Sequence, residues 1–329
     1  MKKNSVNLSV GILMISLLLS GCSAGKDTQD LSIENENMEN EERRMIIGVV
    51  SKSNTSEYWM SVNSGMEAAA AENNIKIVFL APDSELDKEV QEKQVEKLVE
   101  QEVDALAVSP IDSYYVPSYM DEIRQKNIPV VTFDTGFENQ ELPYIGIDNY
   151  KTGYELGKEL AKQLNHTGQV GVVAGDLNQM GHRERMEGFR DYIETEPQMS
   201  LSFVESGYAN LQMSEQKVRT LMEEYPEVKG ILATSAVTAL GLAEEMKNTG
   251  IKIAAVDEQE DSLNALEKGE LAVLAAQSGY DIGYQTIEYI RQMCCGEKTE
   301  QKNYLDAEIL TSENLEEYRR AHENQKYKE

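Results

Sequence analysis

Polar and aromatic side chains stand just past the ends of several short apolar runs of the sequence. They are Ser51, Asn54, Tyr58 and Trp59 after the first run, Asp134 after the fourth, and Asp257 and Gln277 after later ones. A carboxylate can accept hydrogen bonds from two adjacent hydroxyls, and an aromatic face can cover the C–H side of a sugar ring. Taken singly, such an aspartate is more often a helix cap and such an aromatic ring is more often core. Taken together, these residue types favour binding of a polyol.

Residue patterns typical of enzymes are absent from the sequence. The loop from Ser51 to Trp59 lacks the glycines that let backbone approach a pyrophosphate, and the chain has no phosphate loop and no Gly-x-Ser-x-Gly elbow. The three histidines, His166, His182 and His322, do not have the spacing of zinc ligands. We therefore expect a protein that is not an enzyme and that uses no cofactor and no metal.

Alternating strands and helices must position these residues. The apolar runs that predict strands are Ile46 to Val50, Ile75 to Leu80, Ala105 to Val108, Val130 to Phe133, Val170 to Val173, Leu201 to Val204, Ile231 to Ala233, Ile253 to Val256 and Leu271 to Ala275. Amphipathic stretches between them predict helices at Val62 to Asn73, Asp87 to Gln101, Val116 to Gln125, Arg183 to Ile193, Ser214 to Glu224, Ala236 to Lys247, Ser262 to Glu267 and Tyr280 to Cys294. This alternation predicts an α/β fold with two doubly wound parallel sheets. In such sheets, ligands bind beyond the carboxyl ends of the strands.

Length and charge limit the classes of function. The 329 residues suffice for two domains of ordinary size. The net charge of −27 would repel nucleic acid and anionic lipid headgroups, so we expect no nucleic-acid partner. Three cysteines cannot form a disulfide framework, and the adjacent pair Cys294 and Cys295 is expected to place one side chain in the core and one near solvent, with no metal or redox role.

The N-terminal segment has the features of an export signal. Lys2 and Lys3 precede the apolar run from Val6 to Leu19, which is shorter than a membrane-spanning helix requires. The run ends in Leu19-Ser20-Gly21-Cys22, which resembles the lipobox of bacterial lipoproteins. The resemblance implies cleavage after residue 21 and acyl chains on Cys22, and so an extracytoplasmic protein held at the cell membrane. The alternative is an uncleaved anchor with a cysteine after it by chance.

Residues 22–44 are predicted to be a tether. They contain seven acidic residues, Asp27, Asp30, Glu34, Glu36, Glu39, Glu41 and Glu42, and almost nothing apolar. Such a segment cannot bury enough surface to fold by itself. We expect it to hold a globular body away from the membrane.

Short motifs follow one another in a characteristic order along the body of the chain. They are Val49-Val50-Ser51, Tyr58-Trp59, Asp134, Gly146-Ile147-Asp148-Asn149, Arg183-Glu184-Arg185-Met186-Glu187-Gly188-Phe189, Ala239-Leu240-Gly241, Val256-Asp257 and Gln277. In this order the stretch from Met45 to about Thr311 resembles the ribose-binding type of bacterial substrate-binding protein. The resemblance implies two lobes that close on a ligand by a hinge motion, for which periplasmic binding proteins are a standard example.

The family pattern also implies where the lobes begin and end. Three crossovers join the lobes and fall near Asp148, Gln277 and Asp306. The N-terminal lobe is expected to comprise residues 45–147 and 278–305, and the C-terminal lobe residues 148–277 and 306–312. Residues 313–329 are expected to be a charged tail.

The resemblance carries over ligand-binding roles residue by residue. Tyr58 and Trp59 fall where the family places aromatic rings around the sugar, and Tyr208 sits where an aromatic ring is common. Asp134, Arg183, Asp257 and Gln277 match polar groups that bind the ligand. Two positions depart from the pattern: Thr135 follows Asp134 where many members have arginine, and Ser235-Ala236 replaces a familiar Asn-Asp. Both departures point away from ribose itself, toward another ligand or weakened ligand binding.

The family resemblance leaves two partners open. One is the membrane permease of an ABC-type importer, to which the protein would deliver a sugar-like ligand. The other is a membrane sensor kinase, to which a binding protein of this fold can pass a signal instead of cargo. The repressors that share this fold are excluded, because a lipobox stands here in place of a helix-turn-helix.

Overall fold

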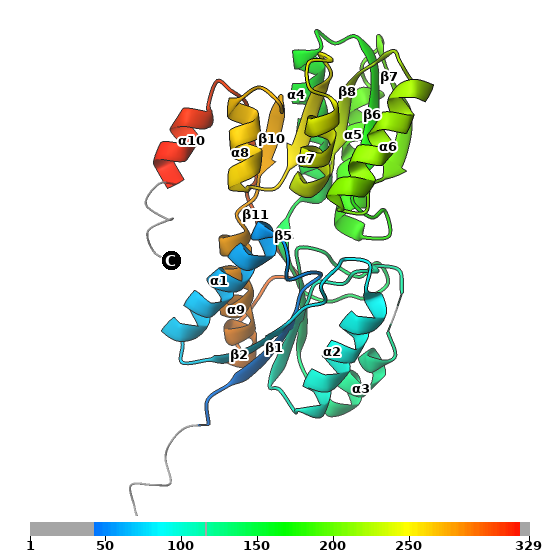
Figure 1. Ribbon diagram of the computed structural model, residues 1–329. Coiled ribbons are helices and arrows are strands. Elements are labelled where there is room, and N and C mark those ends of the chain that lie inside the picture. The colour runs from blue at the N-terminus through cyan, green and yellow to red at the C-terminus, as the bar shows by residue number, and fades with distance from the viewer. Residues whose placement is uncertain (1–42, 116, 323–329) are drawn as a thin grey trace, which may run out of the picture. The chain divides into compact units, whose positions relative to one another are not determined.

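A six-stranded parallel sheet forms the centre of the first lobe. The computed structural model describes residues 43–115 and 117–322 (Figure 1). The strands of this sheet lie in the order β11-β5-β4-β3-β1-β2 and are β1 (Ile46–Val50), β2 (Lys76–Leu80), β3 (Ala105–Val108), β4 (Val130–Phe133), β5 (Tyr144–Ile147) and β11 (Lys302–Leu305). Most of them are short apolar runs because helices cover both faces of a doubly wound sheet.

A second six-stranded sheet forms the centre of the other lobe. Its order is β12-β10-β9-β8-β6-β7, with β6 (Gly168–Ala174), β7 (Met199–Ser206), β8 (Val228–Ala233), β9 (Lys252–Val256), β10 (Val273–Ala276) and β12 (Glu308–Leu310). The pairing is parallel except at the edge, where β12 runs antiparallel to β10. Two parallel-sheet α/β lobes are the fold class that the sequence predicts, so this prediction is confirmed.

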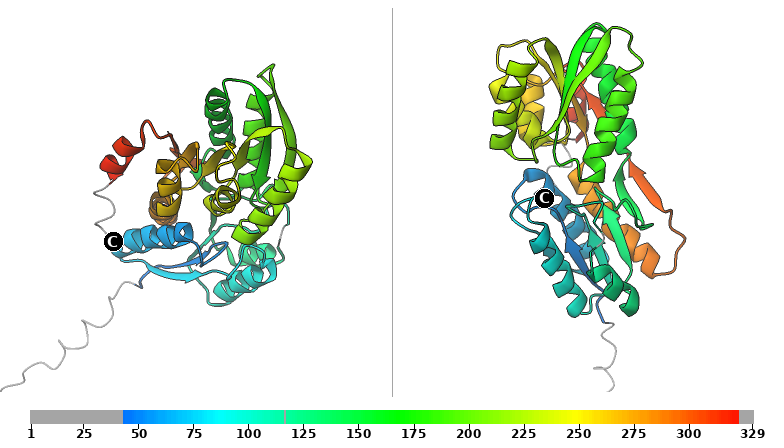
Figure 2. Two further views of the ribbon diagram at one scale, coloured as in Figure 1. Left: turned by 45° about the horizontal axis from the view of Figure 1, so that its top comes forward. Right: turned by 90° about the vertical axis from the view of Figure 1, so that its right-hand side faces the viewer.

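Helices cover both faces of each sheet (Figure 2). The N-lobe, as we call the first lobe, has α1 (Glu57–Glu72), α2 (Lys88–Glu100), α3 (Tyr119–Lys126) and α9 (Gly279–Cys294). The C-lobe has α4 (Asn149–Gln163), α5 (Met180–Ile193), α6 (Leu211–Glu224), α7 (Ala236–Glu245), α8 (Glu260–Glu267) and α10 (Leu315–His322). Alternate residues of β1 enter different cores: Ile47 and Val49 pack with α1 and α9, whereas Val50 packs with α2 and α3.

The chain passes between the lobes three times. It leaves the N-lobe between β5 and α4, returns between β10 and α9, and crosses again between β11 and β12. The described residues from Arg44 onward belong to one compact unit. The crossovers therefore place the carboxyl ends of both sets of parallel strands toward each other, where the site lies.

Glycines allow the closest helix contacts. A Cβ atom on Gly153 of α4 would lie 1.9 Å from the carbonyl oxygen of Arg185 in α5. A Cβ atom on Gly65 of α1 would lie 1.9 Å from the carbonyl oxygen of Tyr280 in α9. Because no side chain can occupy that space, these two helix pairs pack backbone against backbone.

The C-terminal charged segment begins with a helix, and the cysteine pair at the end of α9 is exposed. The predicted charged tail contains α10, whose Leu315 and Tyr318 are buried in the C-lobe core. The prediction for the cysteine pair is wrong, because Cys294 and Cys295 are both exposed. The buried residues of α9 end at Ile290, and the pair lies at the helix end beyond the packed turns.

The signal segment, Cys22 and nearly all of the predicted tether lie outside the described residues. Within residues 43–115 and 117–322, no helix combines the length and apolar character that a membrane span requires.

Candidate functional site

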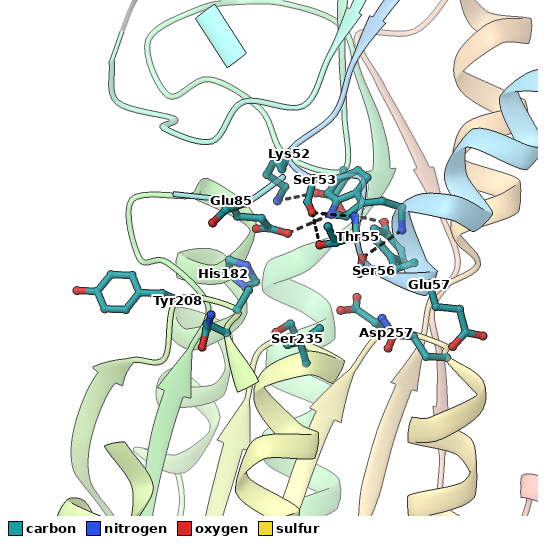
Figure 3. Close-up of a pocket in the computed structure, with 18 of the residues that line it drawn as sticks. Lys52, Ser53, Thr55, Ser56, Glu57, Glu85, His182, Tyr208, Ser235 and Asp257 are labelled. Carbon is teal, nitrogen blue, oxygen red and sulfur yellow. Dashed lines mark hydrogen bonds and ion pairs between the residues drawn. The ribbon is translucent and has the colours of Figure 1, made fainter. Parts of the chain in front are cut away.

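A cavity of about 450 Å³ lies between the two lobes (Figure 3). Loops after β1, β2 and β4 and the first turn of α1 supply its N-lobe wall. Helix α5 and the loops and helix starts after β7, β8 and β9 supply its C-lobe wall. These loops, and the helices that follow them, stand at the carboxyl ends of parallel strands, which is where ligands bind in open α/β sheets. Seven of the predicted site residues line it: Tyr58, Trp59, Asp134, Thr135, Tyr208, Ser235 and Asp257.

Asp134 is the central acidic group of the N-lobe wall. Its Oδ1 accepts a hydrogen bond from the Tyr58 hydroxyl at 2.8 Å, and its Oδ2 lies 2.8 Å from the Lys52 ammonium. Burial alone would raise the pKa of this carboxyl, but the charges of Lys52 and Arg185 and the hydrogen bonds from Lys52 and Tyr58 outweigh it and lower the pKa to about 2. Asp134 is therefore ionised at neutral pH.

Tyr58 and Trp59 occupy the first turn of α1, which Ser56 caps. Their rings meet edge to face, with centroids 5.1 Å apart and planes at 73°. Trp59 also packs edge-on against Phe133, and its indole N–H donates to Glu85 Oε1 at 3.0 Å. The two rings thus form one rigid corner of the cavity and do not offer two parallel faces.

Asp257 is the matching acidic group of the C-lobe wall. Its Oδ2 accepts from the backbone N–H of Ala236 at 3.2 Å, and its Oδ1 accepts from Gln277 and lies 3.9 Å from Arg185 Nη1. Burial raises the pKa of Asp257, Arg185 opposes that rise, and the nearby charge of Asp134 adds to it. Asp134 and Asp257 both have left-handed backbone, with φ of 59° and 86°. Strained residues of this kind concentrate at binding sites.

The arginine that lines the cavity is Arg185, not the predicted Arg183. Arg185 is 4% exposed and donates from Nε to Asn149 Oδ1 at 2.8 Å and from Nη1 to the Thr234 carbonyl at 2.7 Å. Arg183 instead pairs with Glu138 at 2.6 Å and lies outside the cavity lining. Residues two apart on a helix point about 200° away from each other, so only one of the two can face the cleft.

Sequence reasoning also missed His182 and Lys52. His182 lines the cavity, and its Nδ1 lies 2.8 Å from Thr234 Oγ1. Burial, together with the charges of Lys52 and Arg185, lowers the pKa of His182 well below its ordinary value, so its ring is neutral. The position of Lys52, one residue after Ser51, was the available signal, because side chains after a strand end project into this edge.

Ser51, Asn54 and Gln277 lie outside the cavity lining. Ser51 is buried and donates to the Ser53 carbonyl, and Asn54 donates to Asp83, so neither lines the cavity. Gln277 reaches the site only through Asp257. Among the lining residues, Tyr208 is 37% exposed and its ring points away from the cavity (Figure 3).

Ser235 contributes to the wall as a helix cap. Its hydroxyl accepts from the backbone N–H of Thr238 and so caps α7. The backbone N–H of Ala236, the next residue, donates a hydrogen bond to Asp257. The pair that departs from the family pattern therefore orients the C-lobe carboxylate.

The family of the periplasmic binding protein domain matches residues 47–298. The chain belongs to this family. The D-ribose/D-allose-binding protein of Pseudomonas aeruginosa is 26% identical, over 70% of this chain and 76% of its own length. The ribose import binding protein of Bacillus subtilis is 25% identical, over 78% of this chain and 84% of its own. These relatives are binding proteins and not enzymes, which confirms that prediction.

Solved structures of the periplasmic binding protein fold superpose closely. A carbohydrate transporter solute-binding protein from Agrobacterium radiobacter, in complex with D-arabinose, has a TM-score of 0.80 at 21% identity, covering 84% of this chain and 98% of that one. XylFII has a TM-score of 0.74 at 26% identity, covering 82% and 98%. Within residues 43–115 and 117–322, no group of three or more His, Cys, Asp or Glu side chains is arranged to hold a metal ion.

Proposed function

We propose that this periplasmic binding protein binds a neutral sugar or related polyol in the interlobe cavity and delivers it to an ABC-type importer. The observation that carries the proposal is the pair of carboxylates on opposite walls, Asp134 from the N-lobe and Asp257 from the C-lobe, with Arg185 beside the second. Carboxylates accept from sugar hydroxyls and a guanidinium donates to sugar oxygens. A ligand touching both walls favours the closed form.

The charge of the cavity supports a neutral ligand. Six carboxylates line it against two basic groups, Lys52 and Arg185: Glu57, Asp83, Glu85, Asp134, Asp257 and Asp261. Both basic groups already contact carboxylates of the walls. A sugar phosphate or a sugar acid would be repelled by the net negative charge of the cavity. The hydroxyl groups of a polyol could instead donate hydrogen bonds to the carboxylate oxygens.

We also propose that the protein is held at the outer face of the cell membrane by lipidated Cys22. The support is the sequence Leu19-Ser20-Gly21-Cys22 behind a short apolar run. Cys22→Ala should move the protein from the membrane fraction to the soluble fraction. A variant that still sediments with membranes after a high-salt wash would contradict lipid anchoring.

A sensor partner is the second candidate. Its support is that a XylFII–LytSN complex has been solved and that a chain of this complex is 26% identical to the present one, at a TM-score of 0.74. The two functions separate by partner: co-purification from membranes would recover a permease for an importer component, or a kinase for a sensor component. A permease or kinase gene beside this one would point the same way.

The binding proposal is tested with a panel of pentoses, hexoses and polyols. A ligand at 100 times its dissociation constant adds about 2.7 kcal/mol to stability, which a thermal shift detects. Trp59 is the only tryptophan and lines the cavity, so its emission should change with the same sugar.

A variant of the C-lobe carboxylate checks the location of the ligand. Asp257→Ala should weaken binding about tenfold to a hundredfold, because sugar hydroxyls lose a buried acceptor. Asp121→Ala, on the surface of α3, is the control that should leave affinity unchanged. A panel that changes neither the Trp59 emission nor the melting temperature of the unmodified protein would refute sugar binding.

A further inference from the structure

Protein groups join the two lobes directly at one end of the cavity. Lys52 belongs to the loop after β1, and its ammonium lies 2.8 Å from Asp134 Oδ2 and 3.0 Å from Thr135 Oγ1. The same ammonium donates to Gln179 Oε1 at 2.6 Å. Gln179 immediately precedes α5 of the C-lobe, so one buried cation holds oxygens of both lobes.

Gln179 makes a second bond across the lobes with its amide nitrogen. Its Nε2 donates to Glu85 Oε2 at 3.0 Å, while Glu85 Oε1 accepts from the Trp59 indole. Gln179 is fully buried, and its side chain makes no capping bond to α5. Both polar ends of this side chain are therefore committed to the N-lobe, and none of its hydrogen bonds serves its own helix.

We propose that Lys52, Glu85 and Gln179 form an interlobe clasp, a set of positioning residues that draws the lobes together and occupies one side of Asp134. An ammonium has three N–H groups, and three oxygens of the protein lie within hydrogen-bond distance of this one. Hydrogen bonds to a charged group are the stronger kind. The clasp goes beyond the proposed function, because it consists of protein groups and acts whichever ligand binds.

Neighbouring contacts extend the clasp from the loop before α5 into the first turn of that helix. The Ser113 amide donates to the Asn178 carbonyl at 3.0 Å, and the Met180 amide donates to Ser113 Oγ at 2.8 Å. Arg183 pairs with Glu138 of the N-lobe at 2.6 Å. Residues 178–183 thus contact the four N-lobe loops that follow β1, β2, β3 and β4, and these contacts should all separate when the clasp is lost.

The clasp also bears on ligand choice. Lys52 and the hydroxyls of Thr135 and Ser109 donate to Oδ2 of Asp134, and Tyr58 donates to Oδ1, so a ligand must share this carboxylate with four protein donors. Arg185 and Asp257 of the opposite wall then carry the discrimination between sugars. The departure at Thr135 fits this arrangement, because its hydroxyl accepts from Lys52 where an arginine would add a competing cation.

The test uses Gln179→Ala in the full-length protein without added sugar. The substitution removes both cross-lobe bonds and leaves the Lys52–Asp134 pair within the N-lobe. The ratio of closed to open forms should fall about tenfold or more. The matched control is Gln163→Ala, which removes a hydrogen bond within α4 of the same lobe. Lys52→Met is a second variant, which removes the Lys52–Gln179 bond and leaves the Gln179–Glu85 bond in place.

Two readouts distinguish opening from a local effect. Acrylamide quenching of Trp59 should rise, since its partner Glu85 leaves Gln179. Hydrogen exchange at the Ser113 amide, which belongs to the other lobe, should accelerate about tenfold, because exchange follows the open population. Unchanged quenching and unchanged Ser113 exchange in Gln179→Ala would overturn the clasp. Since no sugar is added, this outcome is independent of the sugar panel, which tests the proposed function separately.

Discussion

The buried pair Lys52–Asp134 should dominate the stability of the N-lobe wall. Its two charged atoms are 2.8 Å apart, and the side chains are only 4% and 6% exposed. Asp134→Asn keeps the shape of the side chain but leaves the ammonium without its counter-charge. Breaking a buried pair in this way costs about 3–5 kcal/mol.

The pKa of Asp134 gives an independent magnitude. A fall from 3.8 to about 2 in the folded protein favours the ionised carboxyl by on the order of 2 kcal/mol. The folded-state pKa is depressed, so this contribution is present above a pH of about 4 and is lost as the pH falls toward 2. The stability difference between the unmodified protein and Asp134→Asn should therefore shrink as the solution is acidified through that window.

Urea unfolding followed by circular dichroism measures both effects. The control is Asp121→Asn, because the Asp121–Arg124 pair has the same 2.8 Å separation but side chains 80% and 54% exposed. The control should change stability by less than about 0.5 kcal/mol. Lys52→Met combined with Asp134→Asn should recover part of the loss, since both buried charges are then gone. Equal midpoints for Asp134→Asn and the control would refute the reasoning.

Three further expectations concern other parts of the molecule. Arg185→Lys should weaken sugar binding about tenfold in a titration, because an ammonium cannot reproduce the forked donors of a guanidinium, and unchanged affinity would exclude a ligand contact. Gly153→Ala should lower stability by about 1–3 kcal/mol, because the new Cβ would lie 1.9 Å from the Arg185 carbonyl oxygen; an unchanged melting temperature would contradict it. In the Cys22→Ala variant, a thiol reagent should label both Cys294 and Cys295 without denaturant. Cys294 should react more slowly, because partial burial and the neighbouring thiol raise its pKa. Labelling of only one site would contradict the exposure of the pair.

Most strands could be predicted from the sequence because burial on both faces makes them continuous apolar runs. β5 and α4 were not predicted as elements. α4 contains Gly153 and Gly157, which lower helix propensity. Tertiary packing explains the glycine at position 153, because α4 lies so close to α5 that a side chain on Gly153 has no space. Local propensity does not contain this information.

The location of the cavity could be predicted from the sequence, but the residues that line it could not all be identified. Strand ends located Asp134 and Asp257, because parallel strands bring their carboxyl ends to one edge. The choice between Arg183 and Arg185 depends on how α5 is rotated about its axis. That rotation follows from the packing of Phe189 and Ile193 in the C-lobe core, which a motif match does not include.

The two departures from the family pattern, at Thr135 and at Ser235-Ala236, are explained by groups that lie near each carboxylate in space. The sequence indicates that a cation is lost where Thr135 follows Asp134. In the structure, Lys52 of a different loop brings a cation to the same carboxylate and to the Thr135 hydroxyl. At the opposite wall, the backbone N–H of Ala236 donates to Asp257. Both carboxylates therefore have protein donors, and neither departure from the family pattern leaves a buried charge unpaired.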